Sequence, residues 1–320
     1  MKVLLIGLGR WGKNHFRTLM SLMEEIYVAD LDENQLKEIS IPSDHISTSY
    51  QDFLDRVDAV IVSTPTDSHS RICMECFDKG KDVFVEKPIT LTSQGAIKLV
   101  NQADKHGLIL QVGHIYRYHP ASLKIKKIIE DGKLGTIKYA YGHFMGFKRP
   151  RVDVGVIQTD AIHYYDLFNY LFDELPNAVT GVAKNYLNLP LDDTSVSVLD
   201  YHGKIVVVEA GYMAPEEKRD IGIVGTMGGL HCDFRRNHFL FCNDRHEMKE
   251  NTCVAVEGSV EVIPIESKEA LGIELTAFLD SVKNRSKPLA DGKVGYEALK
   301  IVEACYESSK KGKRIEIEWK

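Results

Sequence analysis

Short apolar runs alternate with amphipathic stretches of helical period over the first 120 residues of the chain. The apolar runs predict strands, and the stretches between them, with apolar residues at helical spacing, predict helices. Such alternation is typical of a parallel sheet with helices on both faces, which binds ligands at the carboxyl ends of its strands. The expected strands are residues 2–6, 26–29, 58–63, 82–86 and 108–113, and the expected helices are residues 11–23, 33–39, 67–79 and 92–107.

The second half has a different pattern, because polar and apolar residues alternate there with a period of two. Long runs of this kind predict an antiparallel sheet with one covered face. At 320 residues the chain is also too long for one ordinary hydrophobic core. We therefore expect a doubly wound α/β Rossmann domain over residues 1–120 and an α+β domain over residues 121–320, in which helices cover one face of a large open, mostly antiparallel sheet. The alternating runs are residues 136–147, 194–201, 204–212, 219–224 and 260–265, and the helices are residues 121–130, 157–172, 268–284 and 294–310.

The helices of the second domain are too few to cover both faces of its sheet. Four apolar residues, Val196, Val198, Val206 and Val208, lie in the alternating runs, and we expect part of this apolar surface to stay open. The same patch on a second copy of the chain would cover it through an isologous contact. We therefore expect a homodimer or a homotetramer that assembles through this sheet.

Composition excludes several classes of protein. The net charge of −6, without a basic tail or stripe, gives no reason to expect nucleic acid as a partner. The apolar runs have the length of strands rather than of membrane spans, and Met1 leads into the first strand without a signal peptide, so we expect a cytoplasmic protein. Cys73 and Cys76 have metal-ligand spacing, and a looser group of histidines and cysteines lies in residues 231–246. We interpret these cysteines as buried reduced thiols and expect no metal.

The first strand leads directly into a glycine-rich turn followed by a helix. Gly7 permits the tight turn, Gly9 lets a pyrophosphate approach bare backbone, and Gly12 lets the helix pack close to the strand. Asp30 ends the second strand, where it can hold the ribose hydroxyls of NAD, and Leu31 follows it in place of an arginine for a 2′-phosphate. This pattern predicts NAD rather than NADP as the cofactor. The turn and the start of its helix are Gly7, Leu8, Gly9, Arg10, Trp11 and Gly12.

Two further motifs have a characteristic spacing from the glycine turn. Val-Glu-Lys-Pro occupies residues 85–88, and a segment running from Asp153 through His163 to Asp166 opens a helix of the second domain. Together with the glycine turn they make the sequence resemble the glucose-fructose oxidoreductase / inositol dehydrogenase (Gfo/Idh/MocA) family over essentially its whole length. Within that family, the sequence resembles the nucleotide-sugar dehydrogenases.

The resemblance implies hydride transfer between NAD and a secondary alcohol of a sugar. It implies a cis peptide bond before Pro88 and identifies Lys87 and His163 as the catalytic pair. This pairing is chemically sensible, because a histidine with a pKa near 6.5 can take the hydroxyl proton while an ammonium stabilises the forming alkoxide. The resemblance also places five residues near the nicotinamide and its ribose: Ser63, Thr64, Pro65, His69 and Glu86.

Two positions depart from the family pattern. Thr159 stands where many members have an aspartate, with Asp160 one step later, so either residue could take that role. Tyr116 stands where the family often has asparagine, and Arg117 beside it is either a substrate contact or a salt-bridged helix start. Among the remaining histidines, we expect His15 to be solvated on a helix surface.

The loop before the catalytic helix is rich in basic residues. Arg149 and Arg151 flank Pro150, and guanidinium groups suit phosphate oxygens. We therefore expect a UDP-activated sugar as the substrate. Three alternatives stay open: pairing of these arginines with the chain's own acids, a free-sugar or inositol dehydrogenase, and a non-catalytic NAD-binding regulatory protein.

Overall fold

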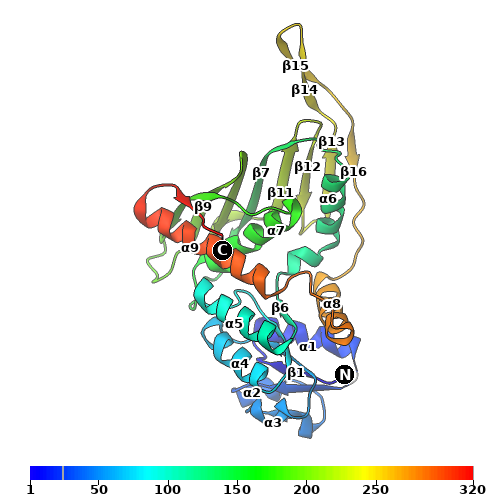
Figure 1. The fold of residues 1–320 in the computed structure, drawn as a ribbon, viewed down its shortest axis with the longest axis vertical. Coiled ribbons are helices and arrows are strands. Elements are labelled where there is room, and N and C mark those ends of the chain that lie inside the picture. The colour runs from blue at the N-terminus through cyan, green and yellow to red at the C-terminus, as the bar shows by residue number, and fades with distance from the viewer. Residues whose placement is uncertain (24, 320) are drawn as a thin grey trace. The chain divides into compact units, whose positions relative to one another are not determined.

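The computed structural model describes residues 1–23 and 25–319, and these fall into two compact units (Figure 1). The first unit consists of Met1–Tyr118 together with Lys268–Leu299, and the second consists of His119–Ser267 together with Lys300–Lys320. The division expected from the sequence differs in one segment. Residues 268–299 belong to the first unit rather than to the second.

Six parallel strands form the sheet of the first unit, in the order β3–β2–β1–β4–β5–β6. The strand order reverses between β1 and β4, which is the switch point where such sheets bind nucleotides. The strands are β1 Val3–Ile6, β2 Ile26–Ala29, β3 Ile46–Ser47, β4 Ala59–Val62, β5 Asp82–Val85 and β6 Leu110–Val112. The helices are α1 Arg10–Leu22, α2 Glu33–Leu36, α3 Gln51–Leu54, α4 Thr66–Asp78, α5 Ser93–His106, the 3-10 helices Ser43–His45 and Ile115–Tyr118, and α8 Ala270–Asn284.

Local capping explains where several of these helices begin and end. The Asp32 side chain accepts the Asn34 amide at the start of α2, and Thr92 accepts the Gly95 amide at the start of α5. Helix α5 ends at Gly107, which adopts the left-handed conformation that favours glycine. Side-chain caps at Asp32 and Thr92 therefore fix where α2 and α5 begin.

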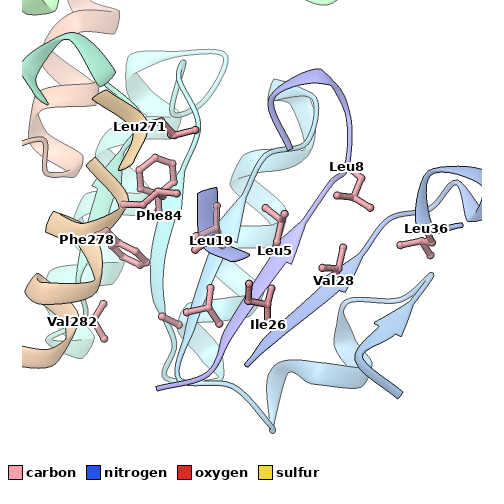
Figure 2. Packing of buried hydrophobic residues seen from close by; sticks show 14 residues of the cluster. Leu5, Leu8, Leu19, Ile26, Val28, Leu36, Phe84, Leu271, Phe278 and Val282 are labelled. Carbon is pink, nitrogen blue, oxygen red and sulfur yellow. The ribbon is translucent and has the colours of Figure 1, made fainter. Parts of the chain in front are cut away.

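Helix α8 packs on the core of the first unit, which explains why residues 268–299 join it (Figure 2). Leu271, Leu275, Phe278 and Val282 recur at helical spacing and are all buried in that core. The Phe278 ring meets the Phe84 ring of β5 edge to face, with 5.8 Å between centroids. The apolar stripe of α8 was visible in the sequence, but a stripe does not tell which sheet it covers.

The second unit contains a nine-stranded sheet in the order β16–β13–β12–β11–β7–β10–β9–β8–β17. Only the β7–β10 pair is parallel among the strand pairs described in this sheet, so the predicted mostly antiparallel fold is confirmed. Strands β7–β12 are Ile137–Phe147, Ala178–Lys184, Thr194–Tyr201, Lys204–Gly211, Met213–Gly225 and Gly229–Asp233, and β13, β16 and β17 are His238–Cys242, Val260–Val262 and Ile315–Glu316. The helices are α6 Pro120–Glu130, the π-helix Ile157–Ala161 and α7 Ile162–Phe172, while α9 Gly292–Lys311 contains the division between the units.

Helix α7 covers one face of this sheet. A Cβ atom on Gly142 of β7 would lie 3.1 Å from the Tyr164 ring, so glycine permits this close approach. Val206 and Val208 pair with Ala140 and Gly142 and are fully buried. The expectation that these valines leave apolar surface exposed is therefore wrong for Val206 and Val208. It holds for Val196, which lies on the face of the sheet opposite to α7.

The opposite face keeps apolar side chains in contact with solvent. Val196 of β9 and Ile205 of β10 are 42% and 37% exposed, and Tyr139 of β7 is 40% exposed. Strands β14 Arg245–Lys249 and β15 Thr252–Val256 form a separate two-stranded ribbon that projects beyond the large sheet (Figure 1). None of the helices in the described ranges has the length and apolar character needed to cross a bilayer.

Candidate active site

The glycine turn between β1 and α1 leaves its backbone open at one point. Gly7 has φ of +95°, and a Cβ on Gly12 would lie 2.0 Å from the Gly7 carbonyl oxygen, so both positions require glycine. At Gly9, by contrast, a Cβ would meet nothing within 4 Å. Gly9 is the N-cap of α1, and no side chain caps that helix. This arrangement fits a pyrophosphate on the helix N-terminus.

Asp30 is fixed at the carboxyl end of β2. Its Oδ2 accepts the Leu8 amide at 2.5 Å and its Oδ1 accepts the Asp32 amide at 2.8 Å. The first bond ties the acidic side chain to the glycine turn, and the second ties it to the start of α2. The Leu31 side chain beside it is almost fully exposed, at 91%. The position of Asp30 fits the ribose role that the sequence predicts.

Buried polar side chains follow strand β4. His69 is 1% exposed, and its ring nitrogens lie 2.9 Å from the Thr64 carbonyl oxygen and 3.0 Å from the Pro88 carbonyl oxygen. Burial lowers the pKa of His69, although both carbonyls and the Glu86 charge oppose this shift. His69 thus links the loop after β4 to the loop after β5.

Lys87 stands at the carboxyl end of β5, before the cis peptide bond that the resemblance implied. Its side chain is mostly buried, and its backbone amide donates to Glu86 Oε2 at 3.1 Å. Glu86 Oε1 lies 2.8 Å from Nε2 of His15, which is fully buried. The prediction of a solvated His15 is wrong, because this face of α1 packs against β5, where the His15 and Phe84 rings meet at 5.3 Å.

Tyr116, which departs from the family pattern, and Arg117 beside it lie in the 3-10 helix Ile115–Tyr118. Arg117 is 7% exposed, and its Nη1 donates to the Leu289 carbonyl oxygen at 3.1 Å. Tyr116 is partly exposed. One hydrogen bond of Arg117 is therefore structural.

In the second unit, the residues expected to bind substrate lie on the π-helix and the first turn of α7. Thr159, Asp160 and His163 are all buried, and the His163 ring stacks on Phe144 with 5.3 Å between centroids and 12° between planes. Thr159 Oγ1 lies 2.6 Å from the Tyr212 hydroxyl, whereas the Asp160 carboxylate forms an ion pair with Lys148. Burial and the Asp160 charge raise the pKa of Tyr212.

Lys148, the lysine of the ion pair with Asp160, lies against two aromatic rings. Lys148 Nζ lies 4.8 Å from the Phe144 ring centroid and 5.1 Å from that of Tyr212. Lys148, Phe144 and Tyr212 are absent from the sequence-based site. Only the folded register brings them to Thr159, Asp160 and His163.

Asp192 anchors the start of the π-helix. Its Oδ2 accepts the Ile157 amide at 3.0 Å, and its Oδ1 accepts the Tyr306 hydroxyl at 2.7 Å. A Cβ on Gly155 would lie 1.7 Å from that Oδ1, so glycine is required there. No local sequence pattern identified Asp192, because its partners are distant along the chain.

The basic loop lies next to this site in the sequence. Arg151 makes a bidentate ion pair with Asp153, whereas the Arg149 residue is exposed. Burial raises the pKa of Asp153, but the hydrogen bonds and charge of Arg151 outweigh burial, so that pKa lies below its ordinary value. One arginine of the loop therefore already has an acidic partner of its own.

The cysteines form no disulfide. Cys73 and Cys76 are buried in α4, and burial raises the pKa of Cys76 to about 12. His231 lies 3.1 Å from Asp220, on the other side of its strand from the buried Cys232. Within residues 1–23 and 25–319, no group of three or more histidine, cysteine or acidic side chains could hold a metal ion.

Comparison with known proteins places this geometry in a family. Residues 1–114 match the oxidoreductase family with an NAD-binding Rossmann fold, and residues 126–317 match the C-terminal alpha/beta domain of the same family. The scyllo-inositol 2-dehydrogenase (NAD(+)) of Bacillus subtilis is 25% identical, and the match covers 99% of this chain and 96% of the relative. The scyllo-inositol 2-dehydrogenase (NADP(+)) IolW of that organism is also 25% identical, with the same two coverages.

The UDP-N-acetylglucosamine 3-dehydrogenase of Acidithiobacillus ferrooxidans is 24% identical, over 93% of this chain and 94% of the relative. A solved structure of that enzyme superimposes with a TM-score of 0.84 at 23% identity, covering 96% of this chain and 97% of the other. The glycine turn, the Glu-Lys-Pro segment and the helix of His163 therefore belong to one known fold. The chain is a member of the Gfo/Idh/MocA family of NAD(P)-binding oxidoreductases.

Proposed function

We propose that this enzyme is an NAD-dependent dehydrogenase that oxidises a secondary alcohol of a UDP-activated sugar, with Lys87 and His163 as its catalytic residues. The observation that carries the proposal is the mostly buried Lys87 at the carboxyl end of β5, one strand from the switch point of the sheet, with its backbone amide bonded to Glu86. A lysine in such a setting is a strong candidate for a functional group.

Different residues would bind the cofactor, accept the proton and stabilise the negative charge that forms in the reaction. The amides at the start of α1 would hold the pyrophosphate, and Asp30 would hold the ribose hydroxyls. Bound NAD supplies the acceptor for the hydride that leaves the substrate carbon. His163 takes the hydroxyl proton from the same alcohol, while the Lys87 ammonium stabilises the negative charge that forms on its oxygen.

The choice between Thr159 and Asp160 follows from their partners. Asp160 is paired with Lys148, so the two charges neutralise each other next to Phe144. Thr159 and Tyr212 form a neutral hydroxyl pair at 2.6 Å. We propose that the hydroxyl pair contacts the sugar and that Asp160 holds Lys148 in place.

A UDP-sugar is supported by the basic loop and by the similarity to a UDP-N-acetylglucosamine 3-dehydrogenase. The alternative, a free sugar or an inositol, is supported by the inositol dehydrogenases among the relatives and by the Arg151–Asp153 pair. The test is a screen for NADH formation with UDP-sugars, free sugars and inositols. An Arg149→Ala/Arg151→Ala variant should raise KM for a UDP-sugar about tenfold, since phosphate contacts are charge-assisted.

The matched control for that variant is Arg235→Ala/Arg236→Ala, which removes two arginines paired with Glu217 and Glu216 in the same unit. The control should leave KM unchanged. Turnover of an inositol or a free sugar alone, unaffected by the loop variant, would reject the UDP-sugar and keep the dehydrogenase.

We propose NAD rather than NADP as the cofactor because the Asp30 carboxylate would repel a 2′-phosphate and Leu31 offers no positive charge. We expect kcat/KM to be at least about tenfold higher with NAD than with NADP. The Asp30→Ala variant should narrow this ratio. Steady-state kinetics with both cofactors measure it, and a wild-type preference for NADP would reject the assignment.

We propose that the enzyme assembles as a homodimer or homotetramer through the open face of the second sheet. Val196, Ile205 and Tyr139 leave apolar surface on that face. Light scattering at micromolar concentration should give at least twice the chain mass, and Val196→Glu should reduce it to one chain. The control Val152→Glu, at a loop position 87% exposed, should leave the mass unchanged. A monomeric wild type would contradict the proposal.

We also propose a cytoplasmic location. Six cysteines without a disulfide, including the adjacent buried pair Cys73 and Cys76, fit a reducing compartment. Fractionation of cells that express the chain tests this directly.

A further inference from the structure

His15 is a fully buried histidine of α1 whose ring reaches the carboxylate next to the proposed catalytic lysine. It lies against Phe84 at 5.3 Å and near Trp11 at 6.5 Å, so two aromatic rings fix its orientation. Nε2 lies 2.8 Å from Glu86 Oε1. Because the acceptor is a carboxylate, Nε2 carries the proton and donates it.

Glu86 connects this imidazole to the lysine backbone. Its own amide donates to the Val62 carbonyl oxygen at 2.9 Å, which fixes its main chain to strand β4. Its Oε2 then accepts the Lys87 amide at 3.1 Å. One carboxylate therefore joins helix α1 to the backbone of Lys87.

The space around this carboxylate leaves it little freedom. A Cβ on Gly113, which follows β6, would lie only 2.9 Å from Glu86 Oε2, so the absence of a side chain there makes room for the carboxylate. Glu86 is 9% exposed, which leaves little water to replace a lost donor. The His15 bond is thus the main constraint on the Oε1 end.

The charge state of Glu86 depends on the same contacts. Burial raises the pKa of its carboxyl, but the His15 hydrogen bond, the charges of His15 and Lys87 and the Lys87 amide outweigh burial. The pKa of Glu86 therefore lies below its ordinary value, and the group carries a negative charge beside the lysine at neutral pH. Without His15, fewer interactions would counteract the effect of burial, and the pKa of Glu86 would rise.

We propose that His15 is a positioning residue for catalysis: through Glu86 it holds the Lys87 backbone and keeps a negative charge beside the lysine ammonium. The role rests on the proposed function, in which Lys87 stabilises the forming alkoxide. His15 itself does not touch substrate in this proposal. It acts only through the carboxylate.

The test uses His15→Phe, which keeps a ring and removes the donor, beside His15→Gln, which restores an N–H group at a similar reach. We expect His15→Phe to lower kcat about tenfold or more while the Kd for NAD changes less than about threefold. The acid side of the kcat–pH profile should move to higher pH, since the pKa of Glu86 rises when the His15 hydrogen bond is lost. His15→Gln should recover most of both losses.

Thr18→Val is the matched control, because Thr18 is a buried polar residue of the same helix at 4% exposure. It should leave kcat and the pH profile unchanged. The His15→Phe/Glu86→Gln double mutant should have a kcat no lower than that of Glu86→Gln alone. Both substitutions break the same chain of contacts, which runs from His15 through Glu86 to Lys87. If His15→Phe does not fold, His15→Asn, whose amide is too short to reach Glu86, replaces it.

Wild-type kcat and an unmoved pH profile in His15→Phe would overturn the proposal, whatever its thermal midpoint. Equal impairment of His15→Gln and His15→Phe would also overturn it. Lys87→Met, measured in parallel, separates the two levels of inference. If Lys87→Met is inactive and His15→Phe is normal, only the role of His15 fails; if Lys87→Met is active, the proposed function fails.

Discussion

Lys87→Met should lower kcat by about 100-fold or more, because methionine keeps most of the side-chain volume and removes the charge that stabilises the forming alkoxide. The cofactor contacts of the glycine turn and Asp30 do not involve this ammonium, so the Kd for NAD should stay within about threefold. Stopped-flow or steady-state kinetics give kcat, and protein fluorescence titration gives the Kd.

Lys13→Met is the control for this change. Lys13 is an exposed lysine of α1 whose ion pair with Glu38 lies on the surface, so its loss should leave kcat near that of the wild type. Near-wild-type turnover in Lys87→Met would remove the core of the proposed mechanism. Absence of turnover in the wild type on every sugar and inositol, with NAD still bound, would instead favour a regulatory protein.

His163→Ala should also lower kcat by about 100-fold or more, since no other base would then take the hydroxyl proton. The ring stacks on Phe144, so the variant should also lose some thermal stability. Added imidazole should restore part of kcat, because a small base can enter the space left by the ring. Thermal shift and kinetics with and without imidazole check both effects.

His202→Ala is the control, because His202 is an exposed histidine of the same unit. Its kcat should equal that of the wild type and should not respond to imidazole. If His163→Ala reaches full turnover with acetate or water alone, and added imidazole does not change its kcat, His163 is not the base.

The pattern of apolar positions predicted the long helices and many of the strands of both units, but not β3, α3 or β8. The glycine turn could be predicted for a different reason: the positive φ of Gly7 and the contact of Gly12 with the Gly7 carbonyl both arise within one β–α connection. His15 also had a usable signal. It lies three residues after Gly12 and four before Leu19, on the face of α1 that is buried.

The second unit's site was harder to predict. Tyr212 reaches Thr159 across 53 positions, and Asp192 joins Ile157 to Tyr306. Such contacts depend on which strands become neighbours, and a single sequence does not encode that locally. The placement of α8 in the first unit has the same origin, because its apolar stripe fits either sheet equally well by pattern alone.

The most direct measurement follows the hydride itself. A UDP-N-acetylhexosamine deuterated on the carbons of its sugar ring would be incubated with enzyme and NAD, and the NADH would be analysed by mass spectrometry. The proposed mechanism predicts NADH that carries one deuterium, formed by the wild type and nearly absent with Lys87→Met or His163→Ala. NADH without deuterium, or no NADH from any deuterated sugar or inositol, would contradict it.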